Sequence, residues 1–67
     1  MTTAETLLMR CLKFFPIKTG RLIQVMLLTD TEEKRWEMIS FLENKLRNNQ
    51  DASEEEILDK AWTIAEM

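Results

Sequence analysis

Apolar side chains recur every three to four residues along most of this chain, which is the spacing that places them on one face of an α-helix. The pattern predicts three amphipathic helices, over about residues 4–14, 32–47 and 53–66. Pro16 ends the first, because the residue before a proline is disfavoured in the α conformation. Short polar residues that favour a helix N-terminus precede the segments: Thr2 or Thr3, Asp30 or Thr31, and Ser53, which forms a capping box with Glu56.

The segment RLIQVMLL, residues 21–28, is ambiguous because its apolar side chains point in nearly every direction around a helix. Ile23 and Val25 are β-branched, so a strand is the alternative. No second strand-like run exists to pair with it, and an isolated strand is unstable. We therefore predict a buried central helix that the others surround. The expected fold is all-α, a compact bundle of three to four helices with short loops that forms one domain over residues 1–67.

A chain of 67 residues buries only a small core, and domains of this size usually add a disulfide, a metal or a second subunit. One cysteine and no histidine exclude an intrachain disulfide and the common zinc sites. We therefore expect no metal, and we expect association, most simply as a homodimer. No signal peptide and no apolar stretch of about 20 residues are present, which favours a cytoplasmic protein without membrane contact.

Catalysis is not expected, and neither is a cofactor. The chain has no histidine, no tyrosine and no glycine-rich phosphate loop. Cys11 lies between Arg10 and Lys13, and nearby cations can activate a thiol. It also shares a helical stripe with leucines and Phe15, and free cysteine is among the most frequently buried residues. We therefore assign Cys11 to core packing.

Charge is distributed unevenly along the chain, whose net charge is −3. Residues 1–29 carry four bases and one acid, whereas residues 30–67 carry five bases and eleven acids. Many acids stand at expected helix starts, where the helix dipole favours them. An alternative function for one such cluster, Glu54, Glu55 and Glu56, is an acidic decoy that imitates nucleic-acid phosphates. A second alternative is a helix-turn-helix DNA-binding regulator at KFFPIKTGRLIQ. Its second helix offers only Arg21 and Gln24 to contact bases, so we expect no nucleic-acid partner.

The apolar surplus suggests what the protein does. Trp36 and Phe41 lie about 140° apart on a helical wheel, so one helix face cannot bury both. Exposed aromatic anchors dominate the energy of many protein interfaces. We therefore expect a non-catalytic module that binds another protein as an adaptor, regulator or inhibitor, for example as an antagonist from a mobile element. The candidate partner-binding residues are Trp36, Phe41, Trp62, Phe14 and Ile17.

Overall fold

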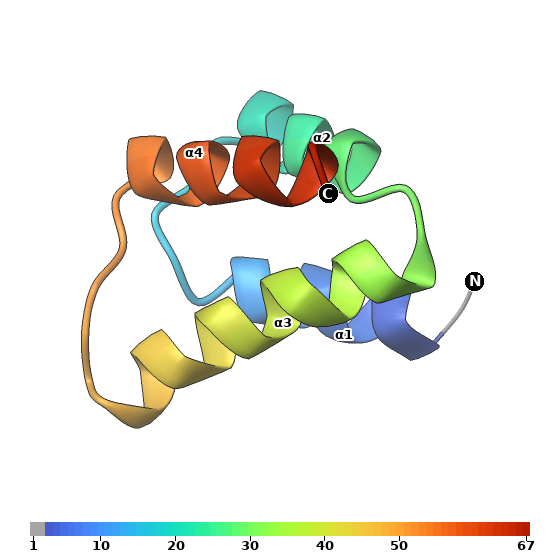
Figure 1. Ribbon diagram of the computed structural model, residues 1–67. Helices are drawn as coiled ribbons and strands as arrows, with labels where there is room; N and C mark the ends of the chain where they lie inside the picture. Colours follow the sequence, from blue (N-terminus) through green and yellow to red (C-terminus); the bar gives the residue numbers. More distant parts are fainter. Residues whose placement is uncertain (1–2) are drawn as a thin grey trace.

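The computed structural model describes residues 3–67 and contains four helices and no strand in that range, which confirms the predicted compact all-α fold with short loops (Figure 1). The helices are α1 (Thr3–Leu12), α2 (Thr19–Leu28), α3 (Glu32–Arg47) and α4 (Glu54–Ala65). Residues 21–28 are therefore helical, and the strand alternative is wrong. Thr3 is the first residue of α1, and Thr2, the other candidate cap, lies outside the described residues.

The four helices form two layers (Figure 1). Helix α1 packs beside α3 in one layer, and α2 packs beside α4 in the other. The two helices of each layer run in the same direction. Every helix is followed in the chain by one in the opposite layer. The core lies between the layers, where each helix turns its apolar stripe inward.

The corner between α1 and α2 lies two residues earlier in the chain than the sequence predicted. Helix α1 ends at Leu12, two residues early, and the N–H groups of Phe14 and Phe15 donate to carbonyls three residues back. Pro16 follows this turn, and α2 begins at Thr19, two residues earlier than expected. The corner therefore turns one of its two phenylalanines inward, since Phe15 is buried and Phe14 is exposed.

The predicted caps account for the boundaries of α3 and α4. The hydroxyl of Thr31 accepts from the N–H of Lys34 at 3.3 Å, and that of Ser53 accepts from the N–H of Glu56 at 3.1 Å. Helix α3 ends in a Schellman motif, in which the N–H of Gln50 donates to the carbonyl of Lys45. Asn49 takes the left-handed conformation that this motif needs, with φ of 53°.

Buried apolar side chains from all four helices and from two of the connections form one core. The fully or nearly fully buried members are Ala4, Leu8, Leu12, Phe15, Val25, Met38, Ile39, Leu42, Ala52, Ile57, Leu58, Ala61 and Ile64. Burial of this apolar surface is the main favourable term for folding. The core draws most on α1, α3 and α4 and least on α2.

The prediction that residues 21–28 form a buried central helix is wrong. Val25 is the only apolar residue of α2 that is buried, while Ile23 and Leu27 on its outer side are 52% and 73% exposed. Helix α2 packs on α4 and on α1 but not on α3, so no helix covers its outer side. The helical wheel shows that apolar side chains lie on all sides of α2. It does not show how many neighbouring helices are present to cover them.

Candidate partner-binding surface

The five predicted partner-binding residues divide into exposed and packed side chains. Phe14 is 73% exposed, Trp62 is 51% exposed and Trp36 is 44% exposed. Phe41 and Ile17 are half-buried and pack against the core. Phe14, Trp36 and Trp62 are therefore accessible to a partner. Phe41 and Ile17 contribute to the packing of the fold itself.

The structure does not gather these residues into one cluster. Phe14 follows the end of α1, Trp36 lies in the second turn of α3, and Trp62 lies near the end of α4. The ends of α1 and α4 are at opposite sides of the molecule (Figure 1). The available contacts are therefore separate patches, each on a different helix or corner.

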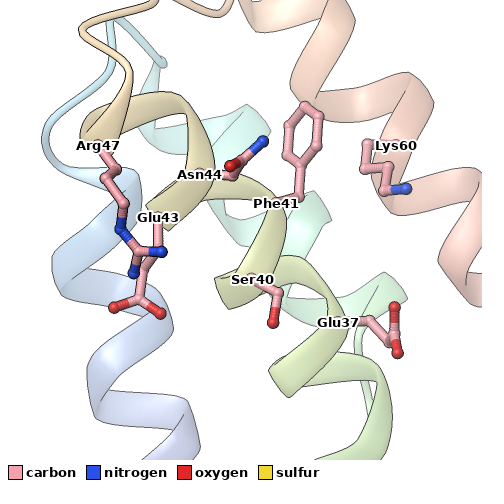
Figure 2. A pocket seen from close by; sticks show the side chains of 7 residues that line it. All are labelled: Glu37, Ser40, Phe41, Glu43, Asn44, Arg47 and Lys60. Carbon is pink, nitrogen blue, oxygen red and sulfur yellow. The ribbon is translucent and has the colours of Figure 1, made fainter.

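Phe41 lies between two cations at the seam of α3 and α4. The Nζ atoms of Lys45 and Lys60 are 5.6 Å and 5.5 Å from the centre of its ring, within the range of a cation–π interaction. Figure 2 shows the ring directed from α3 toward α4, whereas Glu37 and Ser40 point away from it. These side chains line an open groove of about 420 Å³ together with Glu43, Asn44, Arg47 and Lys60. Its walls are mainly polar, so it lacks the apolar lining typical of a small-molecule site.

A second, smaller pocket lies at the end of α1. It has a volume of about 270 Å³ and is lined by Arg10, Lys13 and Phe14. Over residues 3–67, neither Arg10 nor Lys13 forms an ion pair. The pocket therefore combines an exposed aromatic ring with two cations that no internal acid neutralises.

The acidic cluster at the start of α4 is largely used inside the chain. Glu54 Oε2 accepts from the backbone N–H of Lys18 at 2.9 Å, and Glu54 Oε1 is 3.5 Å from Arg21 Nε. Glu56 Oε2 is 2.7 Å from Lys45 Nζ. Glu55 alone of the three is exposed. Glu54 thus supplies the anion at the N-terminus of α2, where Lys18 has no side-chain cap of its own.

The outer side of α4 carries three exposed acids and an exposed tryptophan. Glu55, Asp59, Trp62 and Glu66 are all exposed, and their spacing of four, three and four residues places them along one helix face. Across the described chain, no ion pair involves any of these three acids. The sequence pattern already places these three acids away from the apolar stripe of α4, and the structure adds that Trp62 is exposed among them.

Cys11 has the environment of a packing residue. It is half-buried, and burial together with the nearby Glu43 carboxylate raises the pKa of its thiol. A nucleophilic cysteine needs the opposite shift, toward the thiolate. Within residues 3–67, no group of three or more acidic or cysteine side chains is arranged to hold a metal ion. None of the described helices has the length and hydrophobicity that a membrane crossing requires.

No protein-family model matches the chain, and no curated protein or solved structure is significantly similar to it.

The role of Glu54 can be tested by replacement. Glu54→Ala should lower the free energy of unfolding by about 1 kcal/mol, because it removes a charged acceptor from the start of α2 and the partner of Arg21. Glu55→Ala is the matched control, since it removes a neighbouring acid that is exposed, and it should change stability by less than about 0.5 kcal/mol. Urea denaturation followed by circular dichroism measures both. Equal effects of the two substitutions would show that Glu54 acts only through the helix dipole.

Proposed function

We propose that this chain is a small, non-catalytic, cytoplasmic module that binds another protein and acts as an adaptor, regulator or inhibitor by covering part of that partner's surface. The observation that carries the proposal is the exposure of large apolar side chains on so short a chain: Phe14, Ile23, Leu27, Trp36 and Trp62. Single exposed apolar residues are common on soluble proteins. Two tryptophans and a phenylalanine that remain exposed are aromatic residues of the kind that anchors interfaces.

Local chemistry supports binding rather than catalysis. The larger groove is open and mainly polar, and the thiol near it is shifted away from its reactive form. The exposed aromatics stand beside charged residues, as interface anchors stand inside a polar rim. Phe14 lies beside Arg10 and Lys13, and Trp62 lies between Asp59 and Glu66 on the face of α4.

The two alternatives receive less support from the structure. An acidic decoy at the start of α4 would retain only Glu55, because Glu54 and Glu56 are occupied by Lys18, Arg21 and Lys45. A DNA-reading α2 would present Ile23 and Leu27 outward, with Arg21 held by Glu54. The outer side of α2 therefore lacks the row of free cations that phosphate contacts require. A protein partner is the stronger proposal.

Affinity capture from the native host tests the proposal. The wild-type chain should retain a specific protein, and the Phe14→Ala, Trp36→Ala and Trp62→Ala variants should identify the anchor. At least one should weaken the captured complex more than about thirtyfold, the range of an interface hot spot, with the free energy of unfolding unchanged. Ser40→Ala is the matched control, because Ser40 is exposed and polar. Capture of no protein, or equal capture by a variant that lacks all three aromatics, would contradict the proposal.

A further inference from the structure

Two surfaces of this chain are complementary to each other. The basic corner consists of Arg10, Lys13 and Phe14, around the pocket at the end of α1. The acidic stripe consists of Glu55, Asp59, Trp62 and Glu66, along the outer face of α4. We propose that the acidic stripe of one copy docks on the basic corner of a second copy, so that the chain associates with itself through unlike surfaces. This inference rests on the proposed function, since it names a partner for part of the same exposed surface.

The basic corner has the properties of a receptor for an acidic, aromatic segment. Its pocket of about 270 Å³ has Phe14 as an exposed apolar wall. Arg10 and Lys13 rim the pocket, and Lys18 adds a third exposed cation two residues after Pro16. None of the three side chains is paired with an acid in the portion of the chain that the structure describes. On α3, the charge of Glu43 acts on Cys11, and Arg47 lies beside Glu43 (Figure 2).

The acidic stripe has the complementary composition. Trp62 lies three residues after Asp59 and four before Glu66, so an exposed indole is flanked by carboxylates within about 10 Å along the helix axis. Helix stability does not explain the acid at the end of the stripe. Glu66 is the C-cap of α4, where the helix dipole disfavours an acid, and the last turn contains no base. The only cation of α4, Lys60, is directed toward Phe41 rather than toward the stripe.

The charges of the two surfaces are opposite, with Arg10 and Lys13 at the corner and Glu55, Asp59 and Glu66 on the stripe. A surface with unpaired positive charges around an aromatic ring favours a partner segment that carries an aromatic ring between negative charges. Electrostatic complementarity of this kind selects the partner and its register. A second copy supplies such a segment, and it is the one partner present at the same concentration as the chain itself. Because the contact joins unlike surfaces, it closes into a ring, closes reciprocally in a dimer, or extends as a chain.

The test is a charge exchange between the two surfaces. Variant one carries Arg10→Glu and Lys13→Glu, so its corner and its stripe are both acidic. Variant two carries Asp59→Lys and Glu66→Lys, so its corner and its stripe are both basic. Each variant alone should remain at the mass of one copy in a sedimentation experiment. An equimolar mixture should associate, since every corner then finds a stripe of opposite charge.

The wild-type chain should exceed its single-copy mass of 8.0 kDa as concentration rises at about 20 mM salt, and it should return to that mass at about 500 mM salt because screening weakens contacts between exposed charges. Circular dichroism checks that each variant is helical. Should variant one fail to fold, Phe14→Ala replaces it, because this substitution removes the apolar wall of the pocket without touching a charge, and it should reduce self-association at least tenfold.

Three results would overturn the inference. In the first, the wild-type chain stays at single-copy mass at millimolar concentration and low salt. In the second, each charge variant still associates on its own. In the third, Leu27→Lys on α2 abolishes association and the corner variants do not. The last result would assign self-association to the uncovered side of α2. The wild-type chain can capture a different protein whichever of these three results is obtained. Failure of this inference is therefore distinguishable from failure of the proposed function.

Discussion

Leu42→Ala is expected to lower the free energy of unfolding by about 2–5 kcal/mol, the range measured for truncation of a fully buried leucine. Leu42 has no exposed surface and lies on the core side of α3, between Met38 and the half-buried Leu46. Stability of a domain of this length totals about 3–10 kcal/mol, at roughly 0.05–0.15 kcal/mol per residue. The substitution therefore removes a large part of the margin, and the variant should unfold at a clearly lower temperature than the wild type.

Thermal and urea denaturation followed by circular dichroism at 222 nm measure this effect on the wild type and the variant. Leu27→Ala is the matched control, because it makes the same chemical change at a position that is 73% exposed. It should alter stability by less than about 0.5 kcal/mol. Similar losses for both leucines would mean that the outer side of α2 is covered in solution, and a small loss at Leu42 alone would contradict the proposed core.

The local signals in the sequence were sufficient for the helices. Of the two candidates Asp30 and Thr31, Thr31 caps α3, and Ser53 caps α4 as predicted. Helix α3 also has the predicted bounds, since capping involves residues only three positions apart. The α1–α2 corner was located by Pro16, although the helices on either side differ from the prediction by two residues. Turns of this kind are set by backbone hydrogen bonds that composition does not reveal.

The arrangement of the helices needed information that local patterns lack. Helix α2 was expected at the centre because it is apolar on all sides, but the parallel pairing of α1 with α3 and of α2 with α4 leaves its outer side uncovered. Glu54 was assigned to a surface cluster, and its contact with the N–H of Lys18 joins residues 36 positions apart. Neither fact follows from spacing along one helix, because both depend on which helices become neighbours.

The candidate site illustrates the same limit. Exposed aromatics were expected from the small size of the core, and Phe14, Trp36 and Trp62 are exposed. Which of the five candidates would be packed was not readable, because Trp36 and Phe41 are equally apolar and lie on different sides of one helix. Phe41 faces α4 and Trp36 does not, so the position of α4 decides between them.

Phe41→Ala should therefore act on the fold more than on a partner. We expect a loss of about 2–3 kcal/mol in the free energy of unfolding, somewhat below the range for a fully buried phenylalanine because the ring is half-buried. The ring packs against the core and lies 5.6 Å and 5.5 Å from the Nζ atoms of Lys45 and Lys60, so its removal also takes away two cation–π contacts.

Phe41→Leu separates these two contributions. Leucine retains most of the apolar packing but offers no aromatic face to the lysines, so we expect it to recover more than half of the loss. Phe14→Ala is the matched control on an exposed ring, and its unfolding free energy should stay within about 0.5 kcal/mol of the wild type. If Phe14→Ala and Phe41→Ala prove equally destabilising, the corner is packed in solution and Phe14 is not free to bind. If both leave stability unchanged, Phe41 returns to the set of partner-binding residues, because the seam between α3 and α4 would not depend on its ring.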